Sequence, residues 1–159
     1  MALKRADMTW PMLVLRKHSR IVGCAGVWDQ RACRQVVIRG YSSATARLRP
    51  FYNLAAPLHG RPRLPAVGTA IPQAFLSPLL LEDESDWDGL ALLLRSARAL
   101  AAQQGLGVLT LGLAADHPWR TKIPRMARAI EYCTRLYGVH WGEVQLPTGS
   151  LPMPEASLL

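Results

Sequence analysis

Asp116 and His117 are the residues of this sequence best placed for proton-transfer chemistry. They follow the apolar run at 108–113, and a histidine beside a carboxylate can act as a general base. The structural alternative is that Asp116, with Pro118 two residues later, caps the next helix and leaves His117 as a partly exposed loop residue. The spacing favours the structural alternative, so we keep the pair only as candidate catalytic residues.

A second group of candidate functional residues lies at the end of the apolar run at 20–28. Trp28 and Asp29 put an aromatic ring and a carboxylate at one rim, where they could line a substrate pocket with Asn53 opposite. The alternative is an anchoring tryptophan in an ordinary turn. If Asp29 were buried, it would require an arginine partner such as Arg31 or Arg34.

The densest acidic cluster of the chain lies between two apolar runs, in LLLEDESDWDGLALLL at 79–94. Its five carboxylates are Glu82, Asp83, Glu84, Asp86 and Asp88. They could cap the following helix and pair with the arginine-rich half of the chain, bind a divalent cation, or bind a basic amine substrate. The spacing matches no metal-ligand pattern, so we favour capping with self-pairing and expect no metal site.

Charge is distributed unevenly along the 159 residues. Residues 1–64 hold twelve Lys/Arg against two acidic residues, a net +10, which leaves −2 for the remainder of a chain of net charge +8. Such a half could attract nucleic acid, an anionic membrane surface, a phosphorylated cofactor or an acidic domain, or could reflect the arginine bias of a GC-rich genome. Nucleic-acid motifs are missing, and no apolar run approaches about 18 residues. We therefore expect neither nucleic acid nor a membrane as partner.

The length indicates one domain with a real core, and we assign it to residues 1–146, followed by a Pro/Ser-rich flexible tail at 147–159. Cys24, Cys33 and Cys133 show no CxxC or Cys/His ligand spacing. We interpret them as reduced thiols and expect a cytoplasmic protein.

Hydrophobic periodicity predicts the order of elements. We expect strands at 12–16, 20–28, 73–81, 108–113 and 132–141, helices at 43–58, 90–104 and 119–130, and a surface connector at 60–72. Strand, helix and strand over 73–113 form a βαβ unit, whose strands should be parallel with a right-handed crossover. Pro78 cannot donate to a ladder and predicts a bulge, an edge or a place where pairing stops. The fold class is therefore α/β or α+β, with one mixed sheet around a central βαβ unit.

This order of elements, and the stretch QAFLSPLLLEDESDWDGLALLLRSARALAAQQGLGVLTLGL in particular, resembles the core of the GNAT acyltransferase superfamily. The resemblance implies that two neighbouring parallel strands splay apart and hold acyl-CoA in the gap. It implies acetyl-CoA as cofactor and a small-molecule amine or a protein as acceptor. By the same resemblance, backbone amides of Leu79, Leu80 and Leu81 face the pantetheine, and the helix start at Asp88 and Gly89 faces the phosphates.

Two departures from that family are visible. The family's pyrophosphate turn, [QR]-x-x-G-x-[GA], is replaced here by EDESDWDG, in which carboxylates would repel a pyrophosphate. The family's general-acid tyrosine position falls on Thr134, with Tyr137 nearby but out of register. The family's opening strand and two helices are also missing, which leaves a homodimer or a missing N-terminal domain open. The hypotheses are an N-acyltransferase, or the C-terminal part of one, and a non-catalytic interaction domain that lost the cofactor turn.

Overall fold

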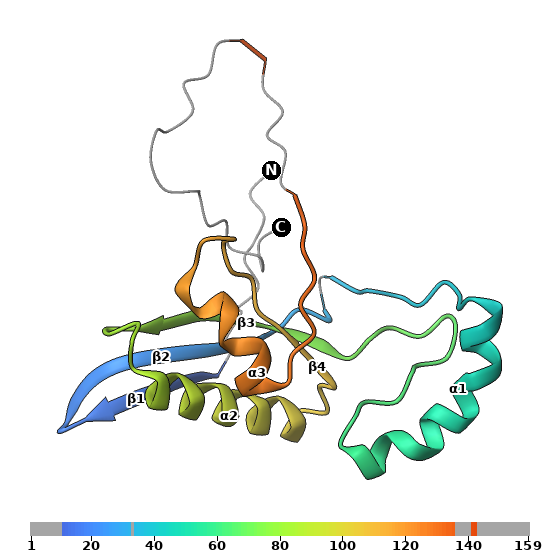
Figure 1. Cartoon of the computed structure of the whole chain (residues 1–159), viewed down its shortest axis with the longest axis horizontal. Coiled ribbons are helices and arrows are strands. Elements are labelled where there is room, and N and C mark those ends of the chain that lie inside the picture. Colours follow the sequence, from blue (N-terminus) through green and yellow to red (C-terminus); the bar gives the residue numbers. More distant parts are fainter. Residues whose placement is uncertain (1–10, 33, 136–140, 143–159) are drawn as a thin grey trace.

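The computed structural model describes residues 11–32, 34–135 and 141–142, and its core is one mixed sheet (Figure 1). Within these residues the strands are β1 (Met12–Lys17), β2 (Arg20–Asp29), β3 (Gln73–Leu81) and β4 (Val108–Thr110), in the order β1-β2-β3-β4. The first two pairings are antiparallel and β3–β4 is parallel. This confirms the predicted mixed sheet and the parallel pair of the βαβ unit.

The first two strands form a hairpin, as their alternation predicts. The two-residue turn between them, His18 and Ser19, has positive φ at both positions (47° and 67°), which matches the right-handed twist of the flanking strands. Leu15 of β1 and Ala25 and Val27 of β2 are buried and face the same side of the sheet.

Helix α2 (Trp87–Gln103) covers that side of the sheet. Its buried residues follow the predicted helical stripe and are Gly89, Leu90, Leu93, Leu94, Ala97 and Ala101. The leucines and alanines among them pack with Leu15, Val27 and Leu76 in one hydrophobic cluster. Gly105, at φ 70°, follows the helix and takes the left-handed conformation that commonly ends one.

The parallel pair is much shorter than predicted. β4 pairs with β3 only from Gln73↔Val108 to Phe75↔Thr110, so the strand expected at 108–113 ends at Thr110. The β2–β3 register shifts where Ala25 opposes Leu79 and Val27 opposes Leu76, which places a bulge around Pro78. The predicted irregularity at Pro78 is confirmed, because a residue without an N–H cannot continue the ladder.

Residues 36–71 form an excursion between β2 and β3, which we call the arm. It contains α1 (Ser43–Ala55) and the 3₁₀ turn η1 (Ala56–His59), close to the helix predicted at 43–58. The two ends of the arm are joined by the isolated bridge Val37↔Ala70. Figure 1 shows α1 at one end of the molecule, beyond the sheet.

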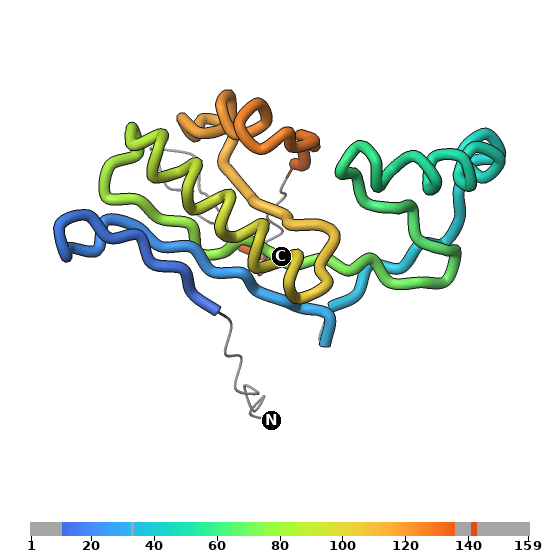
Figure 2. The backbone as a smooth tube through the Cα atoms, turned by 90° about the horizontal axis from the view of Figure 1, so that it is seen from below, coloured from blue at the N-terminus to red at the C-terminus, as the bar shows by residue number. Residues whose placement is uncertain are grey.

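The part after β4 is less regular than predicted. The helix expected at 119–130 consists of η2 (Pro118–Thr121) and α3 (Ile123–Ala127), and it ends where Arg128 takes a left-handed φ of 50°. The strand expected at 132–141 is wrong for residues 132–135, which carry no regular structure; 136–140 lie outside the described residues, as does the predicted tail. Figure 2 shows α2 and α3 on the same side of the sheet. Among the described helices, none has the length and apolar character that a bilayer-spanning segment requires.

Candidate functional site

A narrow cleft of about 70 Å³ lies where β3 and β4 part. Its walls come from β3, from the segment after β4 and from η2. The lining residues are Leu76, Pro78, Leu79, Leu80, Leu111, Gly112, Leu113, His117 and Trp119. The cleft is therefore mostly apolar, with one imidazole, and it lies between β3 and the segment 111–113 that follows β4.

The edge of β3 that borders this cleft presents backbone groups. Glu82 N donates to Val22 O (2.8 Å), so Glu82 and, two residues earlier, Leu80 direct their backbone groups toward β2. Because backbone direction alternates along a strand, Leu79 and Leu81 direct theirs to the opposite edge. Pairing with β4 has already ended at Phe75, so these groups face the gap.

His117 belongs to the cleft, and Asp116 does not. His117 is the N-cap of η2, where its Nδ1 accepts the backbone N–H of Trp119 at 3.2 Å. The expectation that Asp116 provides the cap is wrong, because the imidazole reaches that donor instead and Asp116 is exposed. A neutral imidazole that accepts at Nδ1 carries its proton on Nε2, so His117 can donate there but cannot accept.

Trp119 is a cleft residue that sequence reasoning missed. Its side chain is buried, and its indole N–H donates to Glu84 O at 2.8 Å, which ties η2 to the turn before α2. The signal available in the sequence was a tryptophan directly after a cap and a proline, a position where a large side chain can anchor a short helix.

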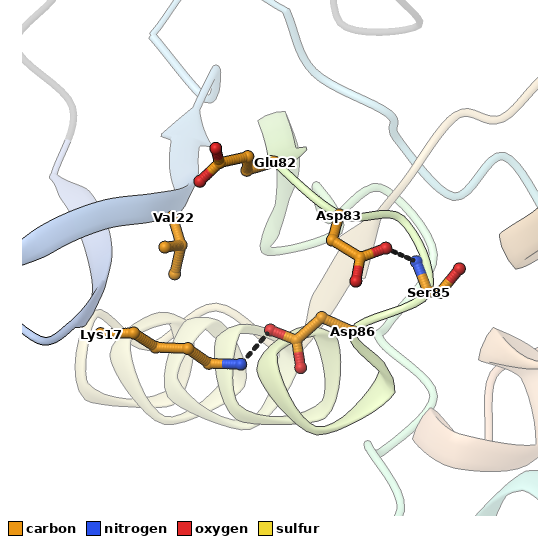
Figure 3. Close-up of a pocket in the computed structure, with 6 residues that line it drawn as sticks. All are labelled: Lys17, Val22, Glu82, Asp83, Ser85 and Asp86. Carbon is orange, nitrogen blue, oxygen red and sulfur yellow. Dashed lines mark hydrogen bonds and ion pairs between the residues drawn. The ribbon is translucent and has the colours of Figure 1, made fainter.

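The acidic turn, residues 82–88, is held by capping and by cations of the β1–β2 hairpin, as the favoured interpretation expected. Asp86 is the N-cap of α2 and accepts the N–H of Gly89 at 3.1 Å. The same carboxylate receives Lys17 Nζ at 2.7 Å, and Arg20 pairs with Glu82. A hollow of about 360 Å³ lies between turn and hairpin (Figure 3).

Gly89 is required at the start of α2 because of close packing. A Cβ at this position would lie 2.3 Å from Asp86 Oδ2 and 2.9 Å from Leu15 Cδ2. Asp86 therefore sits directly on the helix N-terminus and uses the Gly89 N–H that a bound phosphate would need. As it stands, the turn does not fit a pyrophosphate.

The Lys17–Asp86 pair makes stability depend on pH. The hydrogen bond from Lys17, followed by that from Gly89 N–H, holds the pKa of Asp86 below its ordinary 3.8, and the same bond to Asp86 raises the pKa of Lys17 above 10.5. The carboxylate contributes stability above pH 3.8 that is lost as pH falls through its lowered pKa. The ammonium contributes stability below pH 10.5 that is lost as pH rises through its raised pKa.

We expect Asp86→Asn, which keeps a capping oxygen but removes the charge, to have a lower Tm than the wild type at neutral pH. The two Tm values should converge as pH falls below 3.8 through the lowered pKa of Asp86. Thermal unfolding followed by circular dichroism across pH tests this. An unchanged difference at pH 2 would show that the capping geometry, and not the ion pair, is responsible.

The substrate rim proposed from the sequence is not assembled. Asp29 is exposed and pairs with Arg31 (2.7 Å), which holds the pKa of the carboxyl low. Asn53 uses both ends of its amide on Leu64, with Nδ2 donating to O at 3.0 Å and Oδ1 accepting from N at 2.7 Å. No element contact joins α1 to β2 in the described residues, so Asn53 does not lie opposite Trp28.

The remaining candidates are Tyr137 and a metal site. Tyr137 lies outside the described residues. Within the described ranges, His, Cys, Asp and Glu side chains nowhere gather in threes that could hold a metal ion. The candidate site is therefore the cleft with His117 and the adjoining acidic turn.

Comparisons with known proteins give a weak structural likeness. No protein-family model matches the sequence, and no curated protein is significantly similar to it. Among solved structures, the chain is similar to the aminoglycoside N-acetyltransferase AAC(6')-Iy in complex with CoA, at 11% identity and a TM-score of 0.47, covering 87% of this chain and 79% of that one. A likeness of this size does not establish a family.

Proposed function

We propose that the protein is a GNAT-like acyltransferase that binds an acyl-pantetheine thioester in the cleft between β3 and β4 and transfers the acyl group to an amine. The observation that carries the proposal is the early end of β3–β4 pairing at Phe75, after which the two strands separate around an apolar cleft. Parallel sheets bind ligands beyond the carboxyl ends of their strands, and this cleft opens there.

The residues present fit one part of acetyl-CoA and not the other. Leu79 and Leu81 offer backbone groups to the amides of a pantetheine arm, and the apolar walls suit its methylene groups. At the phosphates, Asp86 fills the helix N-terminus and Asp83, Glu84 and Asp88 add negative charge. We therefore infer that the thioester end of the cofactor determines binding.

His117 is the side chain of the cleft suited to hold a proton. With Nδ1 engaged by Trp119 N–H, the neutral ring keeps its proton on Nε2. An acyl thioester supplies an activated carbonyl and a thiolate leaving group when it is bound. We infer that His117 acts in this site as a hydrogen-bond donor through its Nε2–H and not as a general base, because its basic nitrogen already accepts the Trp119 N–H.

The test is thermal unfolding with acetyl-CoA and with acetyl-pantetheine. A ligand at 100 times its dissociation constant adds about 2.7 kcal/mol of stability. We expect acetyl-pantetheine to raise the Tm, and Gly112→Leu, which would fill the cleft, to abolish the effect. Gly40→Leu is the matched control, since a Cβ at Gly40 meets nothing within 4 Å.

If neither ligand shifts the Tm of the wild type, the acyltransferase proposal is wrong. That result would favour a non-catalytic interaction domain, the alternative supported by the Asp86 carboxylate on the helix N-terminus.

A further inference from the structure

The sheet exposes an apolar face on the side away from α2. Leu15 faces α2, since it lies in the hydrophobic cluster with Leu90 and Leu93, so its neighbour Val14 faces the other way. The register pairs Val14 with Cys24 and Cys24 with Leu80, which places the three side chains in one row across three strands. Val14 is 49% exposed and Leu80 59% exposed. We call this surface, with Met12, the open face; no described helix covers it (Figure 2).

The arm presents a second unpartnered apolar surface, and its helix is oriented unusually. The polar side chains of α1 face the chain itself: Arg49 Nε donates to Leu64 O (3.1 Å) and Tyr52 Oη donates to Pro62 O (3.3 Å). The large apolar side chains of the arm helices face solvent, and they are Leu48, Phe51, Leu54 and Leu58, with exposed fractions of 64%, 73%, 78% and 85%. A helix normally buries this stripe.

The arm does not reach the open face of its own chain. Backbone hydrogen bonds join the two ends of the arm, from Ile38 N to Thr69 O (3.1 Å), from Gly68 N to Ile38 O (2.8 Å) and from Ile71 N to Val36 O (2.8 Å). This short paired stem directs α1 beyond the sheet (Figure 1), and α1 contacts no strand. Within residues 11–32 and 34–135, a single chain therefore leaves both surfaces uncovered.

We propose that two copies of the chain form a symmetric dimer in which α1 of each copy packs on the open face of the other. Stable domains pack the apolar face of a helix against the apolar face of a sheet. In this arrangement the apolar side chains of α1 would cover the partner's open face, and the open face would cover them. Helix α1 is roughly 20 Å long and β2 roughly 33 Å, so the helix fits along the strands. Because each copy gives its α1 to the other and receives the other's α1, both contacts are satisfied by two subunits and no further copy can add.

Charge favours this arrangement over pairing of the two arms. Residues 30–81 contain seven arginines and no acidic residue, so two arms would repel each other. The acidic turn lies at the end of β3, next to Leu80 of the open face. An arm on the partner's open face would therefore bring its arginines toward carboxylates.

The first experiment measures oligomeric state by analytical ultracentrifugation of the full chain. We expect a dimer, and we expect Leu54→Asp or Val14→Asp to raise its dissociation constant more than tenfold, because each buries an unpaired carboxylate. Val67→Asp is the matched control. Val67 is 58% exposed and lies in the arm between η1 and β3, and it belongs neither to the open face nor to the apolar side chains of the arm helices. Leu54 is 78% exposed in the single chain, so its variant should keep the Tm that the wild type shows at concentrations low enough for the dimer to dissociate.

Mixing the two weakened variants tests reciprocity. The Leu54→Asp copy keeps its open face and the Val14→Asp copy keeps its arm, so one of the two contacts can form and association should recover in part. Two outcomes overturn the proposal: a monomeric wild type, including one that binds anionic vesicles or nucleic acid, or a dimer that the Val14 and Leu54 variants leave unchanged.

Cross-linking tests the register and covers the case in which Val14→Asp does not fold. With Cys33 and Cys133 replaced by serine, Leu54→Cys should form an interchain link through a bismaleimide to Cys24, which is half-buried on the open face. Cys24→Ala in the same background should abolish the link. A link that persists without Cys24 would show arm-to-arm pairing and overturn the proposal.

Discussion

Replacing Asp83, Glu84 and Asp88 by their amides is expected to tighten the binding of acetyl-CoA by about tenfold or more. None of the three forms an ion pair within the described residues, whereas Glu82 and Asp86 do and are left in place. Two charges about 4 Å apart interact by about 1 kcal/mol in water, and about 1.4 kcal/mol is a tenfold change in affinity. The repulsion removed by the three substitutions together therefore exceeds the roughly 1.4 kcal/mol that corresponds to a tenfold change in affinity, even when salt partly screens it. Isothermal titration calorimetry measures the change.

Two controls isolate the charge effect. Acetyl-pantetheine carries no phosphate, so the triple variant should bind it as the wild type does, and the gain for acetyl-CoA should shrink as ionic strength rises. Asp29→Asn removes a carboxylate at the other end of β3, beside Ala74, and should leave acetyl-CoA affinity unchanged. Equal tightening for both ligands would mean that the turn acts through the shape of the cleft and not through charge.

Leu90→Ala is expected to lower the free energy of unfolding by about 2–5 kcal/mol, the range for a large buried side chain that leaves a cavity. Leu90 is fully buried at the centre of the cluster that joins α2 to the sheet. Domains of this kind have total stabilities of about 5–15 kcal/mol, so this single change removes a large fraction. Urea denaturation measured by circular dichroism gives the difference directly.

Leu92→Ala is the matched control because it makes the same truncation two residues along α2. Leu92 is 46% exposed, and an exposed substitution is expected to cost about 0.5 kcal/mol or less. Similar losses for the two variants would contradict the placement of α2, because they would mean that the helix does not bury the face on which Leu90 lies.

The regular elements were predictable where periodicity is local. The strand expected at 73–81 has those bounds, and the stripe through Leu93, Leu94 and Ala97 does face the core. The segment 132–135 was predicted wrongly, because alternation of side-chain types gives a strand only where a neighbouring strand is available to pair with it. The same reason explains why β4 stops at Thr110: the apolar run continues to Leu113, but pairing with β3 ends at Phe75↔Thr110.

For the site, the order and the types of residue were readable from the sequence, and their partners were not. An acidic turn before a helix predicts capping, and Asp86 caps α2. That Lys17, 69 residues earlier, meets the same carboxylate depends on the hairpin lying beside the turn, as does the Arg20–Glu82 pair. Likewise, His117 and not Asp116 caps η2, a choice made by backbone geometry around Pro118.

By itself, then, the sequence determined the βαβ unit, an irregularity at Pro78 and the chemistry of the turn, because each depends on residues close together in the chain. Only the tertiary structure decided that the strands part at Phe75 and that α1 directs its apolar side chains outward. Both depend on contacts between segments far apart in the chain. An amphipathic pattern predicts that a helix has an apolar face, but it does not predict which segment or which molecule packs against that face.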